Sequence, residues 1–94
     1  NVDGDFIRLS VPTLTQERRN EIVKLVKKRT EDGKIAIRNV RRNSIEDIRS
    51  MEKNSDLSQD ESRRIQSNIQ KITDESIKII DEKSLIKENE VLND

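Results

Sequence analysis

Apolar residues recur every three or four positions along two long stretches of the chain, a spacing that places them on one face of a helix. In residues 16–53, which contain no proline, the apolar or small residues of this face are Ile22, Val26, Gly33, Ile37, Val40, Ile48 and Met51. From Gln59 onward a more regular series follows, at Ile65, Ile69, Ile72, Ser76, Ile79, Lys83, Ile86 and Glu90. We therefore predict two long helices, the first extending over roughly 50 Å or more at about 1.5 Å per residue.

Both predicted helices carry a start signal. Thr15 is suited to an N-cap, because its side-chain oxygen can accept from an exposed N–H of the first turn. Ser58 and Glu61 match the S-x-x-E capping box, in which the two residues satisfy each other's backbone donors. The heptad pattern weakens toward the C-terminus, where fraying is expected. The expected elements are a helix over residues 16–53, a turn over 54–58, a helix over 59–88 and a frayed end over 89–94.

The start of the chain has a different pattern. Residues 6–11 alternate between apolar and polar, which predicts a short strand, and Pro12 blocks its continuation. One strand cannot satisfy its own backbone hydrogen bonds, and no later segment supplies a partner strand. The chain also begins at Asn1 instead of Met. We interpret both features as signs of a fragment.

The two predicted helices should pack antiparallel, since the turn between them is short. The apolar stripe of the second helix is wider than one partner would cover, because Ile77, Ile80 and Leu85 flank its seam. We therefore expect a third helix, or a second copy of the hairpin, against this surface. Gly33 lowers helix propensity by about 1 kcal/mol relative to Ala. We interpret it as a site of close backbone packing in preference to a hinge.

Composition excludes several kinds of chemistry. The 94 residues include no Cys and no His, so disulfides, thiolate chemistry and imidazole catalysis are ruled out. The sequence shows neither a Gly-rich phosphate loop nor metal-ligand spacing, and its carboxylates are scattered over helix surfaces. No apolar run approaches the roughly 20 residues that span a bilayer. We expect a protein that is not an enzyme, takes no cofactor or metal, and has no membrane partner.

Charge is divided sharply along the chain although the net charge is zero. Residues 16–42 hold ten basic and four acidic residues, whereas residues 43–94 hold eight basic and thirteen acidic ones. Lys27, Lys34, Arg38 and Arg41 fall in one stripe, about a quarter-turn from the seam through Ile37 and Val40, and Arg42 lies on the adjoining flank. Arginine suits phosphate because its planar fork donates two parallel hydrogen bonds.

A single aromatic residue in the chain argues against base stacking, so phosphates and RNA shape would be recognised. A solvated helix surface with intrahelical ion pairs explains the same charges equally well.

The order of the motifs resembles the ribosome recycling factor family. Residues 7–12 (IRLSVP) and 14–19 (LTQERR) resemble the hinge and second-helix start of that family, and residues 36–42 (AIRNVRR) resemble its signature segment. Residues 60–64 (DESRR) and 69–74 (IQKITD) resemble its third helix. Nearly the whole chain is covered, in the same order and with similar spacing.

The resemblance implies an all-α fold made of two long antiparallel helices of a three-helix bundle. Residues 1–11 would be the end of an inserted β-rich domain, with the last strand of that domain preceding the helices. The first bundle helix and most of the β domain have no counterpart in this sequence. A hinge would occupy residues 12–15, with Val11 at its border: Val11, Pro12, Thr13, Leu14 and Thr15.

The resemblance also implies a function. Members of the family bind the post-termination ribosome and, with elongation factor G, split it into subunits, without performing chemistry themselves. It places Arg41 first among contacts to large-subunit ribosomal RNA, supported by Arg38 and Arg42, with Lys34 and Lys27 in the same stripe. The expected compartment is the cytoplasm of a bacterium, or an organelle matrix or stroma in a eukaryote.

A second hypothesis comes from another class of protein. The chain could serve as a helical oligomerisation or protein-interaction module, with its basic stripe merely solvated or facing the acidic flank of a partner helix. A homodimer of the hairpin would then cover the wide apolar stripe.

Overall fold

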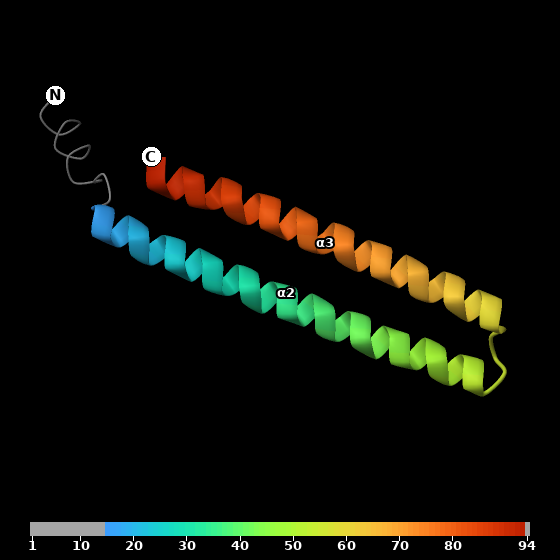
Figure 1. Cartoon of the computed structure of the whole chain (residues 1–94). Coiled ribbons are helices and arrows are strands. Elements are labelled where there is room, and N and C mark those ends of the chain that lie inside the picture. Colours follow the sequence, from blue (N-terminus) through green and yellow to red (C-terminus); the bar gives the residue numbers. More distant parts are fainter. Residues whose placement is uncertain (1–14, 94) are drawn as a thin grey trace, which may run out of the picture.

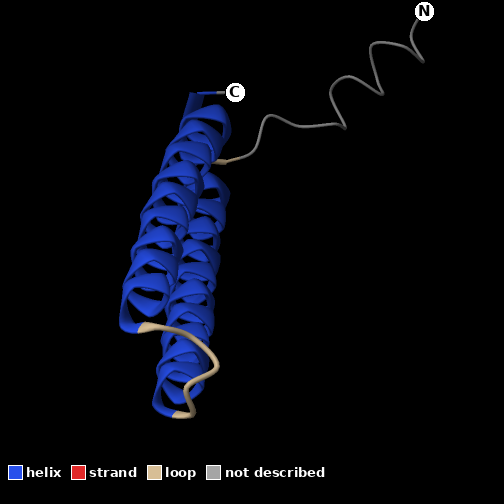
Figure 2. Ribbon diagram, turned by 90° about the vertical axis from the view of Figure 1, so that its right-hand side faces the viewer, coloured by secondary structure: helices blue, strands red, loops and turns tan. Residues whose placement is uncertain are grey.

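The computed structural model describes residues 15–93 as two long helices that form an antiparallel hairpin (Figures 1 and 2). Helix α2 covers Gln16–Lys53 and helix α3 covers Gln59–Asn93. The two helices lie side by side along their length, and the N-terminus of α2 lies at the same end as the C-terminus of α3. The expected all-α hairpin is confirmed. The strand expected at residues 6–11 and hinge residues 11–14 lie outside the described part of the chain.

Both helices begin at the predicted caps. The Thr15 hydroxyl accepts from the Arg18 N–H at 3.0 Å. At the second helix, the Glu61 N–H donates to the Ser58 hydroxyl and the Ser58 N–H donates to the Glu61 carboxylate, each at 3.0 Å. The backbone hydrogen bond from Ser58 lowers the pKa of Glu61, and the hydrogen bond with the Ser58 side chain adds to this effect. The capping box is thus confirmed in both directions.

The end of α2 is closed by backbone hydrogen bonds that reverse the chain. The Ser55 N–H donates to the Glu52 carbonyl at 3.0 Å, and the Asp56 N–H donates to the Met51 carbonyl at 2.8 Å. This is the Schellman arrangement, which places one residue in the left-handed region. That residue is Ser55, with φ of 65°. The tight closure of α2 explains how a short turn brings α3 back along it.

The contact between the helices departs from the predicted seam at several positions, most of them in α3 from Ile72 onward. Val40, expected in the seam, is 64% exposed, and Met51 also lies on the exposed side. In α3, Ile72 is 62% exposed and Ile79 is 51% exposed. The other outward positions of the predicted α3 seam are Lys83, Ile86 and Glu90. The exposed positions of the series form an open stripe, and for them the predicted seam was wrong. Ile65, Ile69 and Ser76 of the same series are half-buried, as the prediction requires.

The true contact face of α3 contains several small polar residues. Ser62 and Thr73 are buried, and Ile77 and Ile80, which were predicted to flank the seam, are half-buried beside them. The Thr30 hydroxyl of α2 lies 2.8 Å from the Ser84 hydroxyl of α3. Hydroxyls of this kind can form hydrogen bonds with each other between helices. A helix face with polar residues can therefore pack against another helix, although the hydrophobic pattern alone would not predict it.

Helix α3 continues through Asn93, five residues beyond the helix end expected at residue 88. Arg19, which is buried in α2, donates to the Val91 carbonyl at 2.9 Å. Val91 is itself half-buried. This contact with the first turns of α2 holds the end of α3, and the weakening heptad pattern gave no sign of it.

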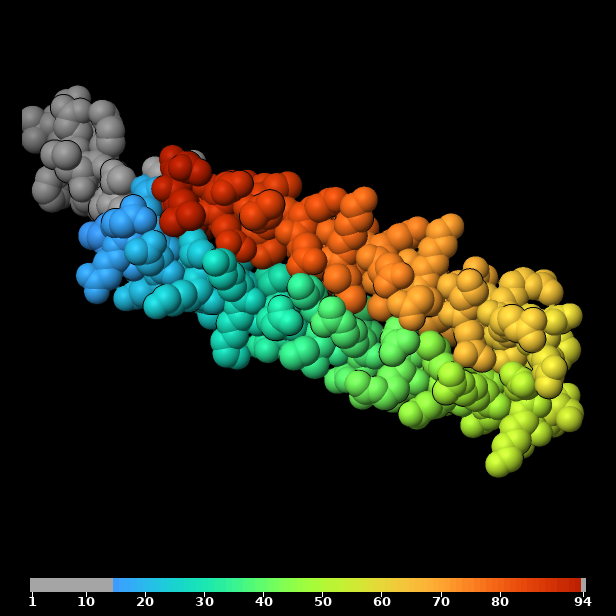
Figure 3. Space-filling view, viewed as in Figure 1, coloured from blue at the N-terminus to red at the C-terminus, as the bar shows by residue number. Residues whose placement is uncertain are grey.

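Gly33 has no close neighbour. A Cβ at this position would meet nothing within 4 Å among the described residues, so the predicted close backbone packing is not found in the hairpin. Gly33 is half-buried within α2. Only α3 packs against α2 in the described residues, and the space-filling view shows the hairpin as two neighbouring rods (Figure 3).

Candidate nucleic-acid interface

The five basic residues of the predicted RNA site differ in how they contact α3. Lys34 is the most enclosed: its side chain is 17% exposed and its ammonium lies 3.0 Å from the Asp81 carboxylate. The Glu31 carboxylate lies 3.6 Å from the same ammonium. The hydrogen bond to Asp81 raises the pKa of Lys34, and the charges of Asp81 and Glu31 act in the same direction. The charge of Lys34 is therefore directed at carboxylates of the hairpin itself.

Lys27 has a looser contact of the same kind. Its ammonium lies 3.9 Å from the Glu88 carboxylate, and its side chain is largely exposed. Because Glu88 also accepts from the Ser84 hydroxyl at 3.1 Å, its carboxylate is shared between the two groups. The positive charge of Lys27 is therefore more exposed to solvent and less compensated than that of Lys34.

Arg41 occupies the edge of the contact face instead of the outer face that the sequence predicts. It is half-buried, and its guanidinium donates to the side-chain oxygen of Gln70 at 3.0 Å. The physical reason is the displaced seam: α3 packs on the flank of Ile37 that carries Arg41, so Val40 is turned outward. Gln70 is neutral, so the positive charge of Arg41 is bonded but not neutralised by this partner.

Arg38 and Arg42 are exposed on the same part of α2. The Arg42 guanidinium donates to the Asn39 side-chain oxygen at 3.2 Å, a neutral contact within the helix. Within residues 15–93, ion pairs of 4 Å or less join other basic residues to carboxylates, but none involves Arg38, Arg41 or Arg42. Arg38, Arg41 and Arg42 share this property with other basic residues of α2 but lie within five consecutive residues, and we call these three the arginine cluster.

A hollow of about 430 Å³ lies beside the arginine cluster, between the two helices. The residues around it are Arg38, Arg41, Gln70, Thr73, Asp74 and Ile77. The sequence pattern gave no reason to place Gln70 or Asp74 at this site. Contacts between antiparallel helices depend on their register, and nothing in the periodicity reveals which residue of α3 stands opposite Arg41.

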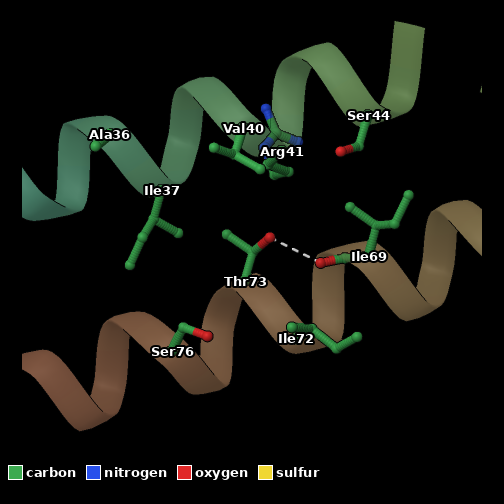
Figure 4. A pocket seen from close by; sticks show the side chains of 9 residues that line it. All are labelled: Ala36, Ile37, Val40, Arg41, Ser44, Ile69, Ile72, Thr73 and Ser76. Atoms are coloured by element: carbon green, nitrogen blue, oxygen red, sulfur yellow. Dashed lines mark hydrogen bonds between the residues drawn. The ribbon is translucent and has the colours of Figure 1, made fainter. Parts of the chain in front are cut away.

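A second groove, of about 400 Å³, lies between the helices on the side of the open stripe (Figure 4). Ile37 points from α2 toward α3, and Thr73 points from α3 toward α2. The walls are completed by Ala36, Val40, Arg41, Ser44, Ile69, Ile72 and Ser76. Arg41 borders both the groove and the hollow, so the open apolar stripe and the arginine cluster adjoin each other.

The described residues contain no group of three or more acidic side chains placed to hold a metal ion. Neither α2 nor α3 has a stretch apolar enough to cross a membrane.

Comparison with known proteins extends over almost the entire chain. The sequence model described as ribosome recycling factor matches residues 1–92. A ribosome-recycling factor of Picosynechococcus sp. is 53% identical over 92 residues, which are 98% of this chain and 50% of that protein. The corresponding protein of Listeria innocua is 51% identical over 92 residues, again 98% of this chain and 50% of the relative.

A ribosome-recycling factor of Symbiobacterium thermophilum is 50% identical over 90 residues, which are 96% of this chain and 49% of that protein. The chain thus spans about half the length of the curated relatives it matches. A family match over residues 1–92 includes α2, all of α3 except its last residue, the capping box and the arginine cluster. The chain belongs to the ribosome recycling factor family.

Proposed function

We propose that the chain acts in ribosome recycling, as part of a translation factor that binds the post-termination ribosome. With elongation factor G as its partner, the factor would split the ribosome into subunits. The chain itself would perform no chemistry and take no cofactor, and it would work in the compartment where translation takes place. The observation that carries the proposal is the arginine cluster, held on one rigid helix of a ribosome recycling factor family member.

The ligand of the arginine cluster would be large-subunit ribosomal RNA. Arg38 and Arg41 are three residues apart, roughly one helical turn, and Arg42 follows directly. A continuous helix holds their guanidinium groups at fixed spacing, which suits the recognition of a structured phosphate backbone. Lys34 and Lys27 extend the same stripe, and would contribute less because carboxylates of α3 and α2 compensate their charge.

Residues before α2 would supply the movement. Pro12, Thr13 and Leu14 stand between the proposed β-rich region, residues 1–11, and the helix, and Val11 lies at the border of that region. Thr15, the N-cap, would mark where rigid structure begins. We propose that residues 12–15, with Val11, act as a hinge that lets the two parts change their angle during splitting.

The test is the binding of Arg41→Ala protein to ribosomes at several salt concentrations. Loss of one phosphate contact should weaken binding and reduce the salt slope by about 0.7 to 0.9. Arg63→Ala is a matched control, because Arg63 is an exposed arginine on α3 paired with Asp60 at 3.7 Å. Unchanged affinity and slope for Arg41→Ala would remove Arg41 from the proposed site.

A second function is favoured by the open stripe of Val40, Ile72 and Ile79. Exposed aliphatic residues in a continuous row mark surfaces that associate with other chains. The chain would then be a helical oligomerisation module, with a second copy covering the groove. Sedimentation of the chain over a range of concentrations distinguishes the two functions: this alternative requires self-association and no affinity for ribosomal RNA.

A further inference from the structure

We propose that Gln70 is a positioning residue for Arg41, holding its guanidinium at the edge of the hollow where an RNA phosphate would bind. This inference rests on the proposed function and adds an α3 residue to a site that the charge pattern confines to α2. It is carried by two hydrogen bonds that join three residues in series across the hairpin.

The first bond runs from the Arg41 guanidinium to the Gln70 side-chain oxygen, at 3.0 Å. The second runs from the Gln70 side-chain nitrogen to the Asp74 carboxylate, at 2.9 Å. An ionised carboxylate can only accept, and a guanidinium can only donate. The Gln70 amide therefore has one orientation that satisfies both neighbours, with its NH₂ toward Asp74 and its oxygen toward Arg41.

The neutrality of Gln70 is the functional point. One heptad earlier on α2, Lys34 meets the carboxylate of Asp81 directly at 3.0 Å. At Arg41 the corresponding α3 residue, one heptad before Asp81, is Asp74, which borders the same hollow. The Arg41 guanidinium bonds instead to the amide of Gln70, one turn earlier, and the Asp74 carboxylate accepts from that amide. The hairpin thus fixes the position of Arg41 without pairing its charge.

Arg41 keeps donors for a ligand in this arrangement. A guanidinium has five N–H groups in a planar fork, and the bond to Gln70 uses one nitrogen. Arg41 borders the hollow of about 430 Å³, and Arg38 borders it as well. A phosphate there would meet a guanidinium already held in one geometry, so less side-chain freedom would be lost on binding.

The experiment compares Gln70→Glu and Gln70→Ala with Arg41→Ala and with the control Gln66→Ala. Gln66 lies one turn earlier in α3 and bonds to Ser62 of the same helix at 3.0 Å. Affinity for the large ribosomal subunit is measured as a function of salt, and circular dichroism checks that each variant is helical.

The carboxylate that Gln70→Glu introduces would pair with Arg41 and neutralise its charge. We therefore expect this variant to weaken binding about tenfold and to reduce the salt slope by about 0.7 to 0.9, as Arg41→Ala does. Gln70→Ala frees Arg41 but leaves its charge, so binding should weaken by a smaller factor with an unchanged slope. Gln66→Ala should change neither quantity.

A double-mutant cycle separates positioning from a general effect of α3. In the Arg41→Ala background, Gln70→Glu should have no further effect on binding. A full additional loss in that background would overturn the inference, as would Gln70→Glu behaving like Gln66→Ala while Arg41→Ala weakens binding. If Arg41→Ala itself has no effect, the proposed RNA site fails, and the role of Gln70 fails with it.

Discussion

Lys34 of α2 and Asp81 of α3 form an ion pair of 3.0 Å across the hairpin, on the same flank of α2 as Arg41. Lys34 and Arg41 are one heptad apart and therefore occupy equivalent positions along the helix contact. Their surroundings differ in charge, because Lys34 meets a carboxylate and Arg41 meets the amide of Gln70. The basic stripe read from the sequence thus divides into Lys34, which pairs with a carboxylate of α3, and Arg41, which bonds to a neutral amide of α3.

Replacing Lys34 tests this division. Lys34→Met keeps an apolar stem but removes the ammonium, so we expect a lower Tm and a smaller fall in the salt slope of ribosome binding than Arg41→Ala causes. Lys28→Met is the control, since Lys28 is well exposed and pairs with Asp32 within α2 at 3.1 Å. A fall in salt slope for Lys34→Met equal to that of Arg41→Ala would contradict the division.

The same ion pair sets a dependence on alkaline pH. The pKa of Lys34 is raised above its ordinary value of 10.5, so the folded state holds the proton more tightly than the unfolded chain. Its contribution to stability is complete below 10.5 and is lost as pH rises through the folded value. Thermal unfolding at rising pH should show this loss in the native protein and not in Lys34→Met.

The capping box gives the opposite dependence, at acidic pH. The pKa of Glu61 is lowered from its ordinary value of 4.5, since its carboxylate accepts from the Ser58 N–H. The contribution of Glu61 is therefore complete above 4.5 and is lost as pH falls through the lower folded value. Glu61→Gln keeps an acceptor for Ser58 but cannot titrate. The Tm of the native protein should approach that of Glu61→Gln as pH falls from 4.5 through the folded pKa. A difference in Tm that stays constant would show that it does not come from the ionised carboxylate of Glu61.

Adjacent isoleucines provide a test of the displaced seam. Ile80 is half-buried against α2, whereas Ile79 is 51% exposed on the open stripe. Ile80→Ala should lower the free energy of unfolding by roughly 1 to 2 kcal/mol, below the range for fully buried sites because burial is partial. Ile79→Ala should cost under about 0.5 kcal/mol. Urea denaturation measures both free energies of unfolding. A larger loss for Ile79→Ala than for Ile80→Ala would show that the predicted seam contacts α2.

Local features of this chain are predictable from sequence because they depend on neighbouring residues. The caps at Thr15 and Ser58 act within one helical turn, and the hairpin follows from two long helices joined by a short turn. The face of α3 that packs against α2 is not predictable in the same way. Ser62, Thr73 and Ser84 carry hydroxyls, so their presence in the contact is invisible to a search for apolar periodicity.

The candidate site shows the same limit. Arg38, Arg41 and Arg42 stand out in the sequence because charge is a property of each residue alone. Gln70 does not stand out, since its role depends on lying opposite Arg41 in the folded hairpin. Asp81 and Glu88, the α3 carboxylates beside Lys34 and Lys27, are likewise distant in sequence, so the charge pattern does not show that they compensate these two lysines.

Gly33 offers a further test of what lies against the open side of α2 in solution. It sits inside a helix, and a Cβ there would meet nothing within 4 Å in the described hairpin. Gly33→Ala should therefore raise the free energy of unfolding by about 1 kcal/mol, through helix propensity alone. Ala36→Gly, at an exposed position of the same groove side, should lower it by a similar amount. Urea denaturation at two protein concentrations measures both changes.

If Gly33→Ala destabilises the protein while Ala36→Gly behaves as expected, another surface must approach the backbone at Gly33. A dependence of that loss on protein concentration would identify the surface as a second copy of the chain.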